Sequence, residues 1–289
     1  MSDMTSNVRF ILLGKAGSGK SATGNFILRR RAFGSRNNPG SFIQETESHS
    51  VKLDNRIVTV VDTPGLFDAK GYLLSTLLNV QSSLDFVQPG PHCFLLVIKY
   101  GKLTEIEHHT AELLKIMFGP KVLEHIIIVF THEDDATVRG KNIEDLVNEL
   151  DENESFKALF DECGRRYITL NNYEPNEELR REKLQKVIMM ADTLAIDWKG
   201  YCEESFSVYR RVLQKHAEDW KGEHLTVEQV RIIKQEQKQE ERKYTIFSNA
   251  AGALVGAGIG ILGAATYAVG PVAVGALTAA LPVIAKHFK

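Results

Sequence analysis

Glycine, lysine and serine recur over residues 14–21 in a spacing that suits phosphate binding. The segment reads G-K-A-G-S-G-K-S and follows an apolar run at 8–13, while residues 21–28 read as the start of a helix. Glycines let a backbone wrap around an anion, and the helix N-terminus adds partial positive charge. This order of strand, loop and helix predicts a phosphate loop. Lys20 is expected near the β- and γ-phosphates, and the Ser21 hydroxyl on Mg²⁺.

A second polar cluster, D-T-P-G at residues 62–65, ends another apolar, valine-rich run at 55–61. A carboxylate at Asp62 can hold the magnesium ion through a water molecule, as the equivalent aspartate does in phosphate-loop enzymes. Gly65 can offer its amide to the γ-phosphate and leaves the following segment free to move. This motif, placed after an apolar strand, favours a GTPase over a generic ATPase.

A third cluster, Thr131 to Asp134, follows the β-rich run at residues 126–130. GTPases usually carry N-K-x-D here, and its aspartate accepts hydrogen bonds from guanine N1 and N2. Asp134 fits that role, while Thr131 replaces the asparagine and His132 the lysine. An imidazole can lie flat against a purine, so His132 is predicted to stack on the base. The alternative is an ordinary surface histidine.

The run at residues 166–170 reads as a further strand, and it ends in Asn171-Asn172. A side-chain amide at Asn171 could donate to guanine O6, which would discriminate against adenine. Together these segments predict GTP and GDP as ligands, with Mg²⁺ as the metal.

These motifs resemble the immunity-associated GTPases (the GIMAP family), which belong with septin-like and chloroplast-import-receptor-like GTP-binding proteins. The resemblance spans about residues 7–205 and rests on segments 14–25, 62–68, 89–97, 131–134 and 170–172. It implies nucleotide contacts from the loop and from the base motifs, and a serine near the nucleotide. These residues are Gly14, Lys15, Ala16, Gly17, Ser18, Gly19, Lys20, Ser21, Ala22, Ser35, His132, Glu133, Asp134 and Asn171. It also implies nucleotide-dependent dimerisation across the nucleotide face.

The chain departs from related GTPases at two places that bear on hydrolysis. Family members carry a threonine in the first switch loop that caps Mg²⁺; here Thr46 is the nearest threonine, and Gln44 is the alternative occupant of that place. Many small GTPases have a glutamine after D-x-x-G, where this chain has Leu66, which cannot orient water. No residue is therefore assigned as catalytic. Slow hydrolysis is expected unless a partner or a second protomer supplies the missing group.

Composition narrows the class of protein. The chain has 289 residues and a net charge of −2, which gives no indication of nucleic-acid binding. Its three cysteines lack metal spacing and imply no disulfide framework, in agreement with a reducing cytosol; Cys93 is expected to be a buried small hydrophobe. Residues 1–7 have no apolar core and do not read as a signal peptide.

Strands alternate with helical stretches through residues 8–200, which predicts an α/β, three-layer phosphate-loop GTPase domain with a mostly parallel sheet. An amphipathic helix is expected at 105–118, and the last helix packing on the sheet at 179–193. The adjacent pair His108-His109 does not share a helix face, so metal binding there is not expected.

Three domains are expected: a G domain at 7–205, a charged helical extension at 206–243, and a hydrophobic segment at 246–285. The polar tract 234–243 favours a solvated helix over a stalk or a coiled-coil surface.

The hydrophobic segment has no charged residue between Lys243 and Lys286, and three of its glycines repeat the G-x-x-x-G spacing that suits close helix packing in lipid. Residues 246–269 are long enough to cross a ~30 Å hydrocarbon core. We expect this segment to associate with a membrane, as a span or a re-entrant hairpin. The alternative is a flexible Gly/Ala-rich helix packed on the G domain.

The sequence thus predicts a guanine-nucleotide-binding protein with slow GTP hydrolysis that acts as a membrane-associated switch or assembling scaffold. GTP-dependent homo-oligomers are expected, on the cytoplasmic face of an intracellular membrane or, alternatively, in the cytosol. The rival hypothesis is a non-hydrolysing GTP-dependent membrane scaffold, in which GTP only shifts the population of switch conformations.

Overall fold

The computed structural model describes residues 7–34, 46–66, 74–100, 110–132, 148, 152, 154–195, 204–221 and 224–256. Several sequence predictions lie outside these residues: Ser35, Gln44, His108, His109, Glu133, Asp134, Cys202 and the tail segment 257–285. The chain divides into two compact units, Met1–Gln239 and Glu240–Lys289.

Within the described residues of the first unit, six strands form one sheet in the order β2-β3-β1-β4-β5-β6. The strands are β1 (Asn7–Gly14), β2 (Glu47–Leu53), β3 (Arg56–Asp62), β4 (Cys93–Lys99), β5 (Ile126–Thr131) and β6 (Tyr167–Leu170). All neighbours are parallel except β2, which runs antiparallel to β3. The carboxyl ends of the five parallel strands therefore meet at one edge of the sheet.

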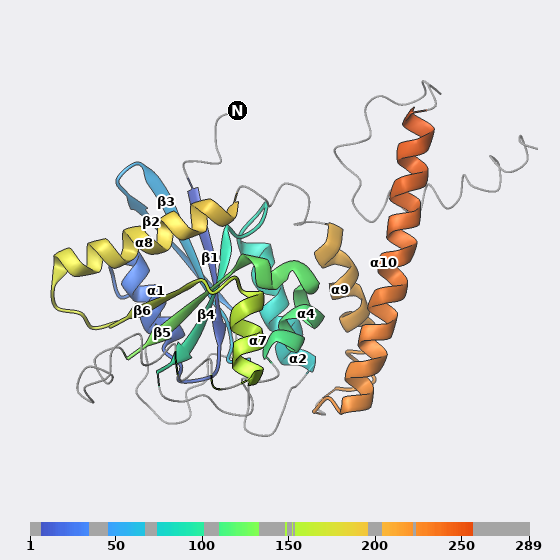
Figure 1. Ribbon diagram of the computed structural model, residues 1–289, viewed down its shortest axis with the longest axis horizontal. Coiled ribbons are helices and arrows are strands. Elements are labelled where there is room, and N and C mark those ends of the chain that lie inside the picture. The colour runs from blue at the N-terminus through green and yellow to red at the C-terminus, as the bar shows by residue number, and fades with distance from the viewer. Residues whose placement is uncertain are drawn as a thin grey trace, which may run out of the picture. The chain divides into compact units, whose positions relative to one another are not determined.

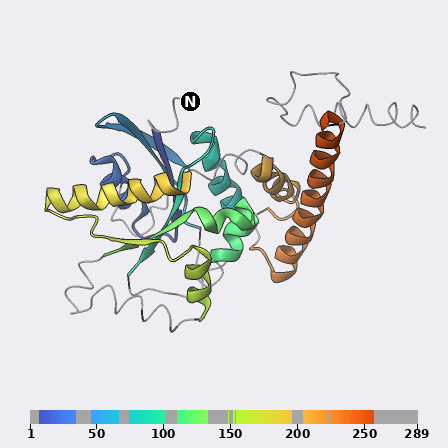
Figure 2. The same ribbon diagram turned by 45° about the horizontal axis from the view of Figure 1, so that its top comes forward.

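Helices cover both faces of this sheet, as the two views show (Figure 1, Figure 2). The helices α1 (Lys20–Leu28) and α8 (Glu177–Ala195) lie on one face. On the other face lie α2 (Leu74–Gln81), α4 (Thr110–Phe118) and α7 (Glu154–Glu162), with the 3₁₀ helices η1 (Ser82–Phe86) and η2 (Pro120–His125). The helix α9 (Glu204–Lys215) packs against α4, and α10 (Val227–Gly256) follows it. The expected three-layer α/β fold is confirmed.

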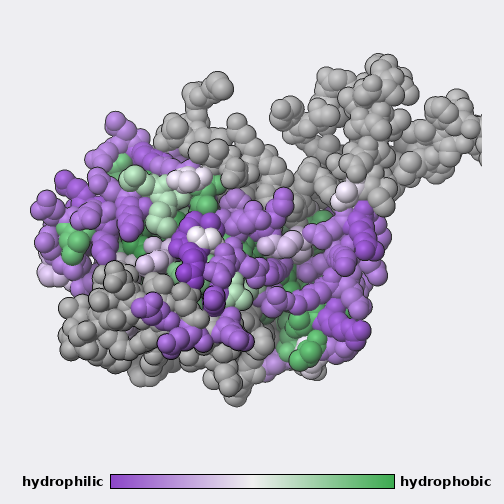
Figure 3. Space-filling view, viewed as in Figure 1, coloured by the Kyte–Doolittle hydropathy of each residue, from purple (hydrophilic) through white to green (hydrophobic). Residues whose placement is uncertain are grey.

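Two apolar clusters hold the layers together, one on each face of the sheet. The larger includes Phe94 of β4 and Phe118 of α4, whose ring centroids are 4.8 Å apart, and Phe206 of α9. Strand β4 is apolar almost throughout because both of its faces are covered by helices. On the face seen in Figure 3, the described residues are mostly hydrophilic, with smaller hydrophobic areas between them.

Most elements agree with the sequence predictions, with one strand added. The apolar runs at 8–13, 55–61, 126–130 and 166–170 correspond to β1, β3, β5 and β6. Strand β2 was not predicted, because its sequence ESHSVKL is largely polar and only partly buried at the edge of the sheet. Cys93 is fully buried and free, as expected.

The polar tract 234–243 is helical, as predicted, since α10 runs through it. Its first half is not wholly solvated: Gln237 is buried, and its Nε2 donates to the Ile116 carbonyl of α4 at 2.7 Å. In the second unit, Lys243 pairs with Glu240 at 2.6 Å along the same helix. Among the described residues, no helix has both the length and the apolar character that crossing a bilayer requires.

Candidate nucleotide site

The parallel sheet brings the sequence motifs to one edge. The phosphate loop leaves β1 at Gly14, Asp62 is the last residue of β3, and Thr131 is the last residue of β5. The register pairs Leu12 with Asp62, and Thr131 with Leu170 at the end of β6. In open α/β sheets, ligands bind outside the carboxyl ends of the strands, so the fold places the predicted motifs where a ligand belongs.

Lys20 is buried at the start of α1, and its ammonium group is held by the loop that precedes it. The Nζ atom donates to the carbonyls of Gly14 at 3.2 Å and Lys15 at 3.1 Å. Burial lowers the pKa of Lys20 below its ordinary value, while the nearby Asp62 carboxylate acts in the opposite direction. A buried cation fixed in this way at a helix N-terminus is arranged to meet an anion.

Ser21 and Asp62 together offer hard oxygen ligands of the kind that Mg²⁺ takes. The Ser21 hydroxyl donates to Asp62 Oδ2 at 2.6 Å. Among the described residues, the buried Asp62 Oδ1 has no hydrogen-bond partner, and neither has the buried Ser18 Oγ in the loop. Burial raises the pKa of the Asp62 carboxyl, an effect that Lys20 and the Ser21 hydrogen bond oppose. An orphaned carboxylate oxygen beside a serine hydroxyl fits the implied magnesium ion, which Ser21 would bind directly and Asp62 through water.

Gly65 lies directly against the phosphate loop. A Cβ added there would be 2.8 Å from the Ala16 nitrogen, closer than real Cβ atoms come, and 3.0 Å from the Ala16 Cβ. The next residue, Leu66, donates its amide to the Gly14 carbonyl at 3.1 Å. The D-T-P-G segment is thus packed onto the loop, with Gly65 against Ala16.

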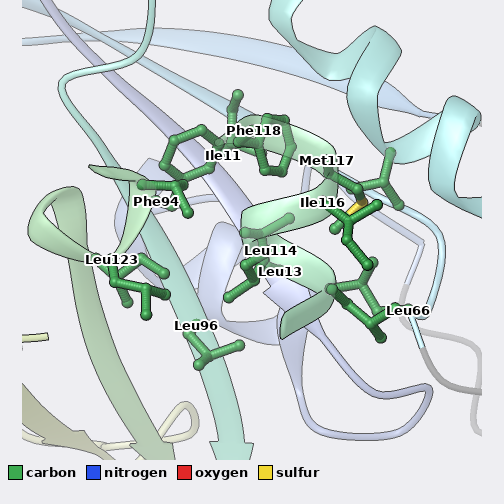
Figure 4. Close-up of a cluster of buried hydrophobic side chains, with 14 of the residues drawn as sticks. Ile11, Leu13, Leu66, Phe94, Leu96, Leu114, Ile116, Met117, Phe118 and Leu123 are labelled. Carbon is green, nitrogen blue, oxygen red and sulfur yellow. The ribbon is translucent and has the colours of Figure 1, made fainter. Parts of the chain in front are cut away.

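The side chain of Leu66 points away from this edge into the larger apolar cluster. It is 1% exposed, and Figure 4 shows it among the side chains of that cluster, near Ile116. Thr46, the nearest candidate for the switch threonine, donates its hydroxyl to the Asn79 carbonyl of α2 at 3.0 Å. Neither residue offers a described group that could position a water molecule beside the loop.

On the base side, the structure assigns contacts that the sequence reading missed. The Thr131 hydroxyl donates to the Ser18 carbonyl at 2.7 Å and lies 3.0 Å from His132 Nδ1. The Asn172 amide exchanges hydrogen bonds with the Thr23 hydroxyl of α1 at 3.2 and 3.3 Å. Asn171, which was predicted to contact the base, accepts a hydrogen bond from the Tyr173 amide at 3.0 Å. The sequence did offer one indication for Thr131: it occupies the place of the asparagine in the N-K-x-D motif, so a contact within the site was to be expected there.

A family model described as AIG1 family matches residues 8–224, which is most of the chain. The chain belongs to the AIG1 family. This confirms the resemblance to the immunity-associated GTPases.

Curated relatives of this AIG1 chain come from plants and animals. It is 31% identical over 199 residues to immune-associated nucleotide-binding protein 9 of Arabidopsis thaliana, a match that covers 68% of the chain and 58% of the relative. It is 33% identical over 190 residues to GTPase IMAP family member 8 of Homo sapiens, covering 65% and 28%. The chain therefore spans less than two thirds of the length of these relatives.

A solved structure shares the fold of the AIG1 chain. Toc33 from Arabidopsis thaliana, in complex with GDP and Mg²⁺, is 17% identical and superposes with a TM-score of 0.51, covering 68% of this chain and 86% of Toc33. The shared fold agrees with the α/β architecture derived from the strand order.

In this AIG1 chain, a pocket of about 680 Å³ opens beside the phosphate loop, between α1 and the segment after β6. It borders the predicted site at Ala22 and is strongly basic. Its lining is Ala22, Asn25, Phe26, Arg29, Arg30, Arg31, Asn172, Tyr173, Glu174, Pro175 and Arg180. Arg29 and Arg180 share the carboxylate of Glu177 outside the pocket. The excess of guanidinium groups favours anionic ligands at this end of the site.

Proposed function

We propose that this chain binds GTP and GDP with Mg²⁺ at the loop Gly14–Ser21 and acts as a GTPase. The observation that carries the proposal is the buried Lys20 ammonium at the N-terminus of α1, beside the Ser21–Asp62 pair with its orphaned carboxylate oxygen. Burial lowers the pKa of Lys20 and raises the pKa of Asp62, so it disfavours the charged form of both side chains. A phosphate group beside Lys20 and a magnesium ion beside Asp62 would stabilise these charged forms. The names of the relatives and the Toc33 complex with GDP and Mg²⁺ point in the same direction.

The proposed contacts follow the geometry where it is described. Residues 14–22 cradle the phosphates, Ser21 and Asp62 serve the metal, and the Gly65 amide serves the γ-phosphate. The base is assigned to His132, Glu133, Asp134 and Asn171, with Ser35 near the nucleotide. We assign the G domain to 7–205, the helical extension to 206–243 and the hydrophobic segment to 246–285.

Competition between nucleotides tests this proposal. A fluorescent GDP analogue is bound to the full chain in the presence of Mg²⁺ and displaced with unlabelled GTP, GDP or ATP. GTP and GDP are expected to displace it at micromolar or lower concentration, and ATP only in large excess. Chelation of Mg²⁺ is expected to lower the affinity for GTP. Equal displacement by ATP, or no binding of the analogue, contradicts the proposal.

Hydrolysis is expected to be slow because Leu66 supplies no polar group to an attacking water. A dilute preparation should turn over at about 10⁻³ s⁻¹ or below, the range of an unassisted small GTPase. Phosphate release under single-turnover conditions measures this rate. The variant Leu66→Gln is not expected to accelerate it, since the side chain at this position is buried in the apolar cluster. A rate near 1 s⁻¹ in a monomeric preparation would show that another residue positions the water.

The second candidate is a non-hydrolysing GTP-dependent membrane scaffold, whose lack of hydrolysis would agree with the buried Leu66. The two differ in how the single-turnover rate depends on protein concentration. Rates that rise steeply indicate a GTP-dependent homo-oligomer in which a second protomer supplies the missing group. Flat, near-zero rates indicate the scaffold.

We further propose that the hydrophobic segment attaches the protein to the cytoplasmic face of an intracellular membrane; the alternative location is the cytosol. An uncharged stretch of this length would expose a large apolar surface in water. The chain 1–289 is therefore expected to float with liposomes and resist carbonate extraction, while a chain ending at Arg242 stays in the aqueous fraction and still binds GTP. A chain 1–289 that is monomeric in detergent-free buffer contradicts membrane attachment.

A further inference from the structure

The Thr131 hydroxyl touches both ends of the candidate site. It is fully buried, donates to the Ser18 carbonyl at 2.7 Å, with the Ile98 carbonyl at 3.5 Å, and lies 3.0 Å from His132 Nδ1. A hydroxyl carries one proton, and carbonyl oxygens only accept. The proton therefore belongs to the carbonyl contact, and the hydroxyl oxygen accepts from His132. This assigns the Nδ1–H form to the imidazole and leaves Nε2 as its acceptor when the ring is neutral.

Thr131 also packs against Gly19, the residue that precedes α1. Gly19 is the N-cap of α1 with φ of +100°, and a Cβ added there would lie 3.2 Å from Thr131 Cγ2 and 3.3 Å from Asn172 Nδ2. Asn172 in turn bonds to Thr23 in the first turn of the helix. Thr131 at the end of β5 and Asn172, just after β6, thus pack against the start of α1, where the predicted phosphate loop ends.

We infer that Thr131 is a positioning residue that couples base recognition to phosphate binding. It holds His132 in one tautomer and ties that ring to the phosphate loop, so both ends of the nucleotide meet one rigid surface. We call the hydrogen bonds of Thr131 to Ser18 and His132 the clasp. Asn172 supports its phosphate side through its hydrogen bond to Thr23. The inference rests on the proposed function, since it assumes that a guanine nucleotide occupies this site.

Thr131→Val tests the clasp, because valine keeps the shape of threonine and removes the hydroxyl. It is expected to lower the affinity for GDP about tenfold and to accelerate release of the fluorescent GDP analogue. Thr131→Ser is expected to bind GDP within about twofold of the parent affinity. Thr193→Val is the control, since the hydroxyl it removes is exposed on α8. Rates are compared well below the melting temperature of each variant.

The nitrogen-15 NMR shifts of the His132 ring supply a readout that a merely structural role does not move. The signal is assigned by its absence in His132→Asn. In the parent, Nδ1 is expected to carry the ring proton and Nε2 to be unprotonated; in Thr131→Val, the Nε2–H form should appear. In Asn172→Ala the tautomer should stay, while GDP binding weakens.

Several outcomes overturn the inference. One is a parent ring in the Nε2–H form, which can be measured even if the valine variant fails to fold. Another is Thr131→Val with unchanged GDP affinity, and a third is weakened GDP binding with an unchanged tautomer. If the parent itself fails to bind GDP, the proposed function fails instead, and the ring tautomer of the nucleotide-free parent still decides whether Thr131 orients His132.

Discussion

Replacement of Lys20 by alanine is expected to lower the affinity for GTP at least tenfold, a loss of about 1.4 kcal/mol or more. The ammonium group is buried at the head of α1 and held by the carbonyls of Gly14 and Lys15, so it needs little reordering to meet a phosphate. Hydrogen bonds between charged groups contribute about 1.5–3 kcal/mol each. Titration with a fluorescent GTP analogue at fixed Mg²⁺ measures the loss.

Two further variants separate charge from packing. Lys20→Met keeps most of the buried volume and removes the charge, so it is expected to bind GTP as weakly as Lys20→Ala. Lys186→Ala removes an exposed lysine from α8 and is expected to bind like the parent. Unchanged affinity in both Lys20 variants would exclude the loop as the nucleotide site.

Ser21→Asn addresses the metal in the same loop. Ser21 bonds to Asp62 and is the proposed direct ligand of Mg²⁺. Its replacement is expected to weaken GTP at least tenfold, about 1.4 kcal/mol, and to remove most of the dependence on Mg²⁺ that the parent shows. A variant whose GTP affinity still responds to Mg²⁺ like the parent would move the metal to other ligands.

The fold was predictable to the extent that local pattern and burial coincide. Strand β1 is an apolar run that leads into a glycine-rich loop, so both the strand and the turn after it followed from the sequence. Strand β2 did not. Its residues pair with β3 at the edge of the sheet, where none of them is fully buried, so the sequence ESHSVKL contains no apolar run of the kind that marks the other strands.

The candidate site was predictable where one residue type serves one chemical role. Lys20, Ser21 and Asp62 lie together as expected, because the parallel sheet brings the ends of β1 and β3 to one edge. The contacts of Thr131 and Asn172 were missed. Their hydrogen bonds join segments more than a hundred residues apart, and threonine or asparagine at a strand end carries no distinctive signal of its own.

The burial of Leu66 shows the limit in another way. The sequence indicated an apolar residue where many small GTPases place a glutamine, but not the direction of its side chain. Its side chain is buried in the larger apolar cluster, together with residues of α4. A substitution at this position therefore alters the packing of the cluster and does not change how an attacking water is held. Under the GTPase proposal, the group that positions water comes from a different position or from a second protomer; under the scaffold alternative, no such group is needed.

Replacement of Asp134 by asparagine is expected to reverse base preference from guanine to xanthine. Asp134 lies outside the described residues, but it comes two positions after His132, which leaves the carboxyl end of β5 at the proposed base site. A carboxylate accepts from guanine N1 and N2, whereas the amide of asparagine also donates and can pair with the 2-oxo group of xanthine. Two charge-assisted bonds are lost, so GTP is expected to weaken on the order of 100-fold or more.

The fluorescent GDP analogue carries guanine, so Asp134→Asn is probed with a fluorescent xanthosine diphosphate instead. The parent and the control are probed with the GDP analogue, and each probe is displaced with GTP or XTP. Asp135→Asn is the matched control, since it makes the same change one residue further along the chain. Only Asp134→Asn should prefer XTP. If Asp135→Asn shows the switch, the base motif is shifted by one residue. If neither variant changes the ratio of XTP to GTP affinity, guanine is read by other groups, and the basic pocket beside Ala22 becomes the place to look for them.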